Sequence, residues 1–357
     1  MRILLEGVSK SFGPTHVIED LDLEVRDGEM MALLGPSGCG KTTTLLSICG
    51  IHRISAGRIL FGEREVGDWP PQRRNVGVVF QNYALYPHLT VYENIAFPLR
   101  VRKESHREID AKITGIVSIL RVGELLDRRP AQLSGGQRQR VAIARTLAAE
   151  PSLLIMDEPL SALDEPTRER ILWDISALKE RFAIPMLYVT HNLREAYSLA
   201  DRVVVIDQGK VIEKGAREDI LERPAHFRTA QCVGIENLFP CRVLNFVNGE
   251  MKVQMGEKEI SLHEDARFRP GERAYLGISP PDVRLSVAPE DRPNTLTATV
   301  VSIMERKNIM VVHVKIFPDG PRLVADIQKH FLPKWGLASG SPVYVSLTQN
   351  ALFLCRE

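Results

Sequence analysis

The decisive stretch of this 357-residue chain is Gly35-Pro36-Ser37-Gly38-Cys39-Gly40-Lys41-Thr42. It fits the pattern G-x-x-x-x-G-K-[ST], a glycine-rich loop that wraps the phosphates of a nucleotide. An apolar run at 30–34 precedes it, and a segment of helical character at 43–48 follows. A strand, a tight loop and a helix N-terminus in this order direct backbone N–H groups and a helix dipole at one anion. The stretch therefore predicts a phosphate site, with the Lys41 ammonium on the β- and γ-phosphates and the Thr42 hydroxyl on Mg²⁺.

The composition is that of an ordinary globular chain, with 44% hydrophobic and 25% charged residues. Lys and Arg number 46 against 45 Asp and Glu, and this net charge of +1 gives no sign of a nucleic-acid partner. No apolar run approaches the ~18 residues that cross a bilayer, and the first residues lack the long apolar segment of a signal peptide. The five cysteines form no C-x-x-C pair, which favours free thiols in a reducing compartment.

The pattern of apolar residues predicts two domains, 1–234 and 235–357. In the first, short buried strands alternate with amphipathic helices, which is typical of an α/β fold with a mostly parallel sheet. The strands are expected at 153–156 and 186–189, and the helices at 105–128, 137–149 and 167–182. In the second, prolines and glycines separate short β-rich runs, which favours a small all-β, OB-like barrel. These runs are 243–247, 252–255, 297–302, 310–316 and 343–347.

An acidic pair follows the apolar run at 153–156. Asp157 at the end of a buried strand can hold Mg²⁺, and Glu158 can polarise the attacking water as a general base. His191, at the end of the next expected strand, is a candidate for a hydrogen bond to the γ-phosphate, although a lone histidine is more often structural. An acid after an apolar run is common at strand ends, but given Lys41 and Thr42 the acidic pair becomes a strong signal for the second half of a nucleotide site.

A second glycine-bearing helix start lies at Leu133-Ser134-Gly135-Gly136-Gln137. Taken alone, it reads as a helix N-cap with a flexible lead. It is also a second N-terminus able to accept an anion, and one chain already has a phosphate loop. Such a site makes sense if it serves the ATP of a partner chain.

Residues 1–234 resemble the ATPase subunit of ATP-binding cassette (ABC) transporters, with a helical subdomain at about 85–150. The family's motifs occur in the family's order. Val79-Phe80-Gln81-Asn82-Tyr83 matches the Q-loop, 133–137 the LSGGQ motif, 157–158 the Walker B pair, 161–164 the D-loop and His191 the switch histidine. Phe12 stands where the family stacks an aromatic ring on adenine, usually a tyrosine; the ring face is kept.

The resemblance implies a role for each matching residue. The catalytic residues would be Glu158, His191 and Gln81. The residues that bind Mg²⁺ would be Thr42, Gln81 and Asp157. ATP binding falls to Phe12, Val17, Gly35, Pro36, Ser37, Gly38, Cys39, Gly40, Lys41, Thr42, Thr43, Ser134, Gly135, Gly136, Gln137 and Asp164.

The resemblance also implies an assembly. Two copies form a head-to-tail homodimer that sandwiches two ATP molecules, each between the phosphate loop of one chain and the LSGGQ motif of the other. ATP favours the closed dimer and hydrolysis reopens it. The dimer lies peripherally on the cytoplasmic face of the inner membrane and drives two integral-membrane permease subunits, which dock at 83–88 and 105–128. An extracytoplasmic substrate-binding protein acts through the permease.

The tail resembles the TOBE/Mop-like β domains of maltose, polyamine, iron and molybdate importers. The stretch 277–283 matches their G-I-R-P-E-D-V segment, with Ser279 in place of arginine. The order of the segments at 294–300, 323–327, 336–345 and 349–352 favours molybdate or tungstate as cargo. Sugar, sulfate, iron and polyamine stay open as alternatives. A dimerisation module that binds no ligand is the simplest interpretation of this tail.

Two other classes of protein fit less well. A soluble, non-transport cassette ATPase usually carries two cassettes or a long coiled-coil insertion, and this chain has neither. A nucleic-acid-binding β-barrel needs a dense basic patch with interleaved aromatic residues, which 236–357 lacks.

Overall fold

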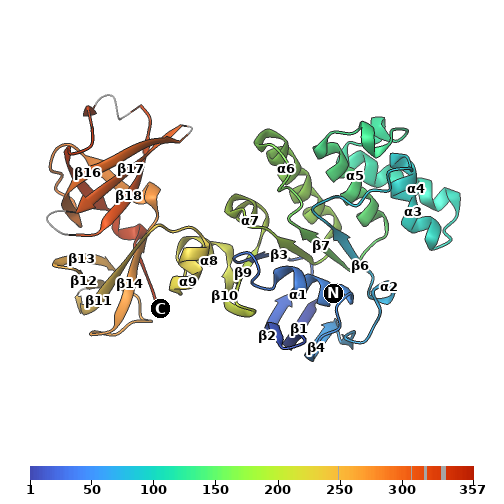
Figure 1. Ribbon diagram of the computed structural model, residues 1–357, viewed down its shortest axis with the longest axis horizontal. Coiled ribbons are helices and arrows are strands. Elements are labelled where there is room, and N and C mark those ends of the chain that lie inside the picture. Colours follow the sequence, from blue (N-terminus) through green and yellow to red (C-terminus); the bar gives the residue numbers. More distant parts are fainter. Residues whose placement is uncertain (248, 307, 317–319, 331–334) are drawn as a thin grey trace. The chain divides into compact units, whose positions relative to one another are not determined.

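A computed structural model describes residues 1–247, 249–306, 308–316, 320–330 and 335–357. The chain forms two compact units, Met1–Arg217 and Glu218–Glu357 (Figure 1). The division between the units lies after Arg217, whereas the sequence predicted it at 234. Most of α8 (Arg217–Glu222) and all of α9 (Phe227–Cys232) therefore belong with the second unit. The Phe227 ring packs against Tyr275 with ring centroids 4.2 Å apart, which explains why this segment goes with the β domain.

A six-stranded sheet forms the centre of the first unit, in the order β10-β9-β3-β8-β7-β6. All neighbours pair in parallel except β10 with β9, which confirms the predicted mostly parallel sheet. The strands β3 and β8 are buried along their whole length, as is usual when both faces of a sheet are covered. The bounds are β3 Met30–Leu34, β6 Val76–Val79, β7 Leu153–Asp157, β8 Met186–Val189, β9 Arg202–Asp207 and β10 Lys210–Ala216.

A smaller antiparallel sheet has the order β2-β1-β4-β5. Its strands are β1 Ile3–Phe12, β2 Thr15–Val25, β4 Ala56–Phe61 and β5 Arg64–Glu65. Its apolar side chains share one core with β3 and with helix α1 (Lys41–Cys49). This core fixes the sheet against the helix that follows the phosphate loop.

Three helices gather at one end of the first unit, namely α3 (Val91–Val101), α4 (His106–Leu120) and α5 (Gly135–Ala148) (Figure 1). Each begins with a capping box, which satisfies otherwise unpaired N–H groups of the first turn. The predicted helix 105–128 ends earlier, since Arg121 adopts a left-handed conformation. The remaining elements are α2 Pro71–Arg74, α6 Glu165–Phe182, α7 Leu193–Leu199 and the 3₁₀ turns η1 Gly123–Leu125 and η2 Pro130–Gln132.

The second unit contains two five-stranded antiparallel sheets around one core. Their orders are β13-β12-β11-β14-β20 and β15-β19-β16-β17-β18. Each predicted β-rich run lies in a strand. The bounds are β11 Asn237–Val247, β12 Glu250–Met255, β13 Lys258–His263, β14 Arg273–Ile278, β15 Val283–Ser286, β16 Thr295–Arg306, β17 Ile309–Ile316, β18 Arg322–Gln328, β19 Pro342–Leu347 and β20 Phe353–Cys355, with η3 Pro280–Asp282 and η4 Gln349–Ala351.

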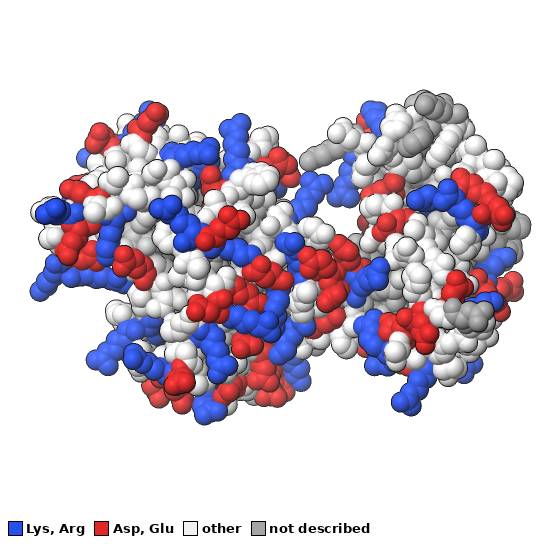
Figure 2. Space-filling model, turned by 180° about the vertical axis from the view of Figure 1, so that it is seen from behind, with Lys and Arg blue, Asp and Glu red and all other residues white. Residues whose placement is uncertain are grey.

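Acidic and basic side chains are interspersed over the face drawn in Figure 2. Among the helices that the structure describes, none is long and apolar enough to cross a membrane.

Candidate functional site

The phosphate loop joins the buried strand β3 to α1. Three of its glycines, Gly35, Gly38 and Gly40, have φ values of 151°, 80° and 107°, which side chains other than hydrogen rarely tolerate. A Cβ atom on Gly35 would also lie 2.1 Å from the Ile206 carbonyl oxygen. The loop can therefore take this path only with glycine at these positions.

Lys41 begins α1 and is only 9% exposed. Its Nζ donates to the carbonyl oxygens of Gly35 and Pro36, both at 2.8 Å, and lies 3.7 Å from the Cys39 Sγ atom. These contacts hold the ammonium group inside the curve of the loop. This is where a phosphate bound to the loop's N–H groups would need a positive charge.

One cavity of 260 Å³ brings the phosphate loop and the acidic pair together. It is lined by Val17, Ser37, Gly38, Gly40, Lys41, Thr42, Thr43, Asp157, Glu158 and Val189. Burial, helped by the neighbouring Glu158 charge and opposed by Lys41, raises the pKa of Asp157. A cation next to this carboxylate would lower its pKa again. Thr42 and Asp157 are hard oxygen donors of the kind that would suit Mg²⁺.

Glu158 is held in an unusual backbone conformation. Its φ is 44°, in the left-handed region, and its N–H donates to the Val189 carbonyl oxygen on the next strand at 2.9 Å. Its Oε1 lies 3.2 Å from Nδ1 of His191. Non-glycine residues with positive φ are uncommon and cluster at functional sites. The backbone and His191 therefore both fix the direction of the Glu158 carboxylate.

The segment that carries His191 is anchored by Glu195, which the sequence analysis did not single out. The buried Glu195 Oε2 accepts hydrogen bonds from the Tyr188 hydroxyl at 2.9 Å and from the Thr190 hydroxyl at 2.7 Å. The Thr190 Oγ1 in turn accepts from the Asn192 N–H at 2.9 Å. Burial, followed by the Glu195 charge, raises the pKa of Tyr188 well above its usual value.

Gln81 does not line the cavity. Its Nε2 donates to the Ser161 hydroxyl at 3.1 Å, and that hydroxyl donates to the Glu158 carbonyl oxygen at 3.0 Å. Gln81 therefore reaches the acidic pair through Ser161 rather than directly.

The motif at 133–137 forms the start of α5. Ser134 and Gln137 make a capping box, with the Gln137 N–H donating to Ser134 Oγ at 3.3 Å and the Ser134 N–H donating to Gln137 Oε1 at 2.9 Å. A Cβ atom on Gly136 would lie 2.5 Å from the Thr167 Cγ2 atom of α6. Ser134 therefore caps α5, and Gly136 allows α5 to pack closely on α6, so both residues have a structural role within their own chain. Among the described residues, none of 133–137 lines the phosphate cavity.

Two further candidates lie outside the lining of the cavity. Asp164 caps α6 by accepting from the Thr167 N–H at 3.0 Å, and this hydrogen bond lowers the pKa of Asp164. Phe12 is 44% exposed at the end of β1, with its ring 4.5 Å from the Lys10 ammonium and edge-on to His52. Its ring is thus accessible to a planar ligand.

A second residue that the sequence analysis missed is Arg74, which is buried beneath α1. Its Nη1 donates to the carbonyl oxygens of Ser47 and Ile48 at 2.8 and 2.9 Å. These carbonyls belong to the last turn of α1, where i+4 donors run out, and that of Ser47 also accepts from the Gly50 N–H at 3.1 Å. Its other nitrogens donate to carbonyls at 67 and 69, and burial lowers the pKa of the guanidinium. Arg74 therefore fixes the far end of the helix that begins in the phosphate loop.

Comparison with known proteins agrees with this architecture. The family model for ABC transporters matches residues 18–161, and that for the TOBE domain matches residues 290–354. A spermidine/putrescine import ATP-binding protein, PotA of Thermotoga maritima, is 39% identical over 285 residues, covering 80% of this chain and 77% of the relative. The trehalose/maltose import ATP-binding protein MalK of Thermococcus litoralis is 40% identical over 305 residues, covering 84% and 80%.

A solved structure shares the fold over about three-fifths of the chain. CbiO1 from Clostridium perfringens, part of the ABC transporter complex CbiONQ, matches with a TM-score of 0.58 at 29% identity, covering 61% of this chain and 89% of that one. The motifs, the fold and relatives that align along about four-fifths of the chain lead to one conclusion. The chain belongs to the ABC transporter family, as the ATP-hydrolysing subunit of an import system with a C-terminal TOBE domain.

Proposed function

We propose that the cavity between α1 and β7 holds the phosphates of ATP and that Glu158 is the general base. The observation that supports this most strongly is the lining itself, in which Lys41 and Thr42 meet Asp157 and Glu158. The cation and the loop's N–H groups stabilise charge on the phosphates, while the carboxylate orients and deprotonates water. His191 would hold Glu158 through Nδ1, which leaves Nε2 to face the γ-phosphate.

Thr42 and Asp157 are the residues proposed to hold Mg²⁺. When bound there, the ion neutralises phosphate charge and relieves the repulsion between Asp157 and Glu158. Because Gln81 is bonded to Ser161, we propose that it senses the site through the 158–161 turn. It would join the metal's shell only after leaving Ser161.

We further propose that two copies of this chain complete each other's ATP sites. The capping box of α5 uses the N–H groups of Ser134 and Gln137, which leaves those of Gly135 and Gly136 for an anion, yet this helix start lies outside its own chain's cavity. A partner's ATP would use it, with Ser134, Gly135, Gly136 and Gln137 on the γ-phosphate and Asp164 near the dimer contact. Because each copy would contribute one half of each site, mixing two inactive variants tests the proposal directly.

The test uses a matched pair of caps at residue 134. Asp and Asn cap helices about as well as Ser, so Ser134→Asp and Ser134→Asn should both fold. The aspartate repels the γ-phosphate, and we expect Ser134→Asp to lose ATP hydrolysis while Ser134→Asn keeps most of it. Lys41→Ala should also be inactive. Mixing Lys41→Ala with Ser134→Asp should restore activity, because the heterodimer has one complete pocket. The shared-site proposal is wrong if the mixture stays inactive, or if Ser134→Asp alone hydrolyses ATP at the wild-type rate.

The permease contact is proposed at the start of the helical subdomain. The rings of Tyr86 and Phe97 pack at a tilt of 45° with centroids 4.6 Å apart, and Phe97 and Val101 are exposed. Apolar groups at such a surface suit a docking partner. We propose that the partners are two membrane permease subunits and an extracytoplasmic binding protein, with this chain on the cytoplasmic face of the membrane. The relatives, which are named as import ATP-binding proteins, support a separate membrane component.

The relatives favour a cargo other than molybdate or tungstate. Their names carry spermidine/putrescine and trehalose/maltose, so they support the polyamine and sugar alternatives rather than molybdate or tungstate. We propose an organic cargo of one of these two classes. Uptake of labelled spermidine, maltose and molybdate by vesicles that hold the whole transporter decides between them, with Glu158→Gln as the blank. Uptake of molybdate alone would contradict the proposal.

A further inference from the structure

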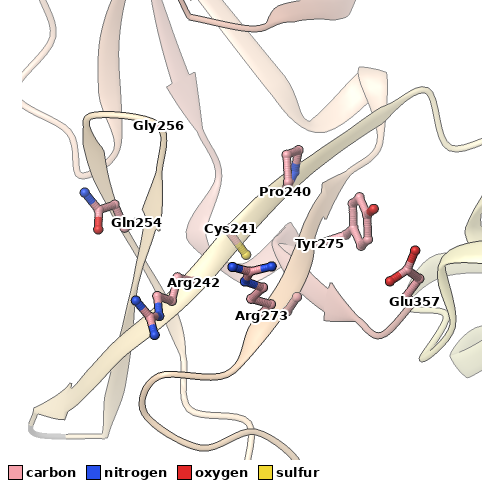
Figure 3. Close-up of a pocket in the computed structure, with 9 residues that line it drawn as sticks. Pro240, Cys241, Arg242, Gln254, Gly256, Arg273, Tyr275 and Glu357 are labelled. Atoms are coloured by element: carbon pink, nitrogen blue, oxygen red, sulfur yellow. The ribbon is translucent and has the colours of Figure 1, made fainter.

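A second cavity, of 500 Å³, lies in the Glu218–Glu357 unit on the sheet β13-β12-β11-β14-β20 (Figure 3). The residues that matter for its chemistry are Arg242 on β11, Gln254 on β12, and Arg273 and Tyr275 on β14. All of them precede the segment 290–354 that matches the TOBE model. No role assigned above uses this cavity.

Three polar side chains form a row across the cavity wall. Arg242 lies on the middle strand, with Gln254 as its register partner on one side and Arg273 on the other. Neighbouring strands lie about 4.8 Å apart and directly opposite side chains share a face, so the two guanidinium groups and the amide are adjacent donors. The Arg242 Nε atom donates to the Gly271 carbonyl oxygen at 3.1 Å, which orients that side chain.

Neither arginine of the row is held in a salt bridge in the part of the chain that the structure describes. Among the residues that the structure describes, neither Arg242 nor Arg273 has an ion-pair partner within 4.0 Å. Glu259 lies opposite Gln254 and pairs with Lys252 at 3.6 Å. Glu357 also lines the cavity, but on the Tyr275 side, away from Arg242 (Figure 3). Like charges directly opposite each other destabilise an antiparallel pair, and a bound anion would offset that cost.

Other chemistries fit this cavity poorly. Burial raises the pKa of Cys241 to about 12, so its thiol stays protonated and is no nucleophile. Among the described residues no group of three or more His, Cys, Asp and Glu side chains is placed to hold a metal ion. The donor row is therefore the feature that selects a ligand.

We propose that Arg242 and Arg273 bind the phosphoryl dianion of a small organic phosphate. Two guanidinium forks match the charge of about −1.5 to −2 and the several oxygens of a phosphate monoester better than the single charge of a carboxylate. The volume falls within the roughly 300–1,000 Å³ of small-molecule sites and exceeds what inorganic phosphate alone would fill. Pro240 and the Tyr275 ring, packed on Phe227, provide an apolar wall for the organic part.

Chemical modification of arginine tests this proposal residue by residue. The full chain, free of nucleotide, is treated with phenylglyoxal in chloride, inorganic phosphate, glucose 6-phosphate or glucose at one ionic strength. Peptide mass spectrometry follows Arg242 and Arg273, with the exposed Arg269 outside the cavity as the internal control. Protection slows modification by 1 + [L]/Kd, roughly tenfold at ten times the Kd.

We expect inorganic phosphate and glucose 6-phosphate to protect Arg242 and Arg273, glucose to protect neither, and Arg269 to react equally in all four. Stronger protection by the ester supports an organic phosphate, whereas equal protection identifies free phosphate as the ligand and overturns the organic part. Arg273→Gln should abolish protection of Arg242, while Arg269→Gln should not. The proposal fails if phosphate slows the pair no more than Arg269, or if Arg242 stays protected in Arg273→Gln.

Discussion

Glu158 and His191 meet where the parallel strands β7 and β8 end, with Oε1 and Nδ1 3.2 Å apart. The two residues come from separate segments of the chain, and the sheet brings them together because parallel strands end at a common edge. Glu158 is further restrained by its left-handed backbone, and the His191 segment by the buried Glu195. The site is thus built for a fixed carboxylate beside the phosphate loop.

Glu195→Gln should weaken both the fold and the reaction. The amide oxygen can still accept from both hydroxyls, but more weakly than a carboxylate oxygen, and the NH₂ group would replace Oε1, which lies 3.5 Å from the Arg168 Nε atom. We expect a loss of about 1–3 kcal/mol in the free energy of unfolding and a lower kcat, since the turn before His191 loosens. Denaturant unfolding and steady-state hydrolysis measure the two effects. Tyr188→Phe, which removes only one donor, is the milder control; equal stability of Glu195→Gln and the wild type would refute the anchoring role.

Asp157→Asn should raise the thermal stability of the nucleotide-free chain at neutral pH. The pKa of Asp157 is raised in the folded state, mainly by burial and then by Glu158. The folded state therefore holds this proton more tightly, so stability falls as the pH rises through the window between the ordinary and the raised pKa, and the full penalty is present above it. Asparagine lacks this penalty.

The advantage of Asp157→Asn should shrink as the pH falls through that window. Thermal unfolding in EDTA across the pH range measures it. Added Mg²⁺ and ATP should then stabilise the wild type more than the variant, because the variant has lost the proposed metal ligand. A wild type that is at least as stable as Asp157→Asn in EDTA at neutral pH would count against the role of burial.

Gly136→Ala should destabilise the chain by about 1–3 kcal/mol through overpacking, because its Cβ would lie 2.5 Å from the Thr167 Cγ2 atom. Thr167→Ser removes that methyl group and keeps the N–H that Asp164 caps. The double variant should therefore recover most of the stability, as unfolding curves of the four proteins will show. Hydrolysis should recover with it, since the backbone N–H of residue 136 is unchanged. Additive losses would mean that the contact between α5 and α6 is not the reason for this glycine.

Much of the fold could be predicted because its signals are local. Apolar runs at 153–156 and 186–189 correspond to the buried strands β7 and β8, and three-and-four spacing located α5 and α6. The phosphate loop was predictable because its chemistry requires glycine at fixed positions. The domain boundary was harder to predict, because α9 is an ordinary short helix in the sequence. Its packing on Tyr275 becomes visible only in the folded structure.

Arg74 and Glu195 could not have been predicted in the same way. Arg74 stands in the polar stretch Pro70–Arg74, which reads as exposed, and its carbonyl partners at 47 and 48 are distant in sequence. Glu195 lies on the short helix α7, where an acid in the first turn is common. Their roles depend on burial among partners that only the tertiary structure brings together.

The most direct test of the central claim is single-turnover hydrolysis of γ-labelled ATP by the wild type and by Glu158→Gln, with ATP binding measured on the same samples. Glutamine keeps the shape of Glu158 but cannot take a proton from water. The account predicts that Glu158→Gln binds ATP with Mg²⁺ as tightly as the wild type, stays dimeric in its presence and hydrolyses it at least about 10²-fold more slowly. Hydrolysis at the wild-type rate by Glu158→Gln would contradict it.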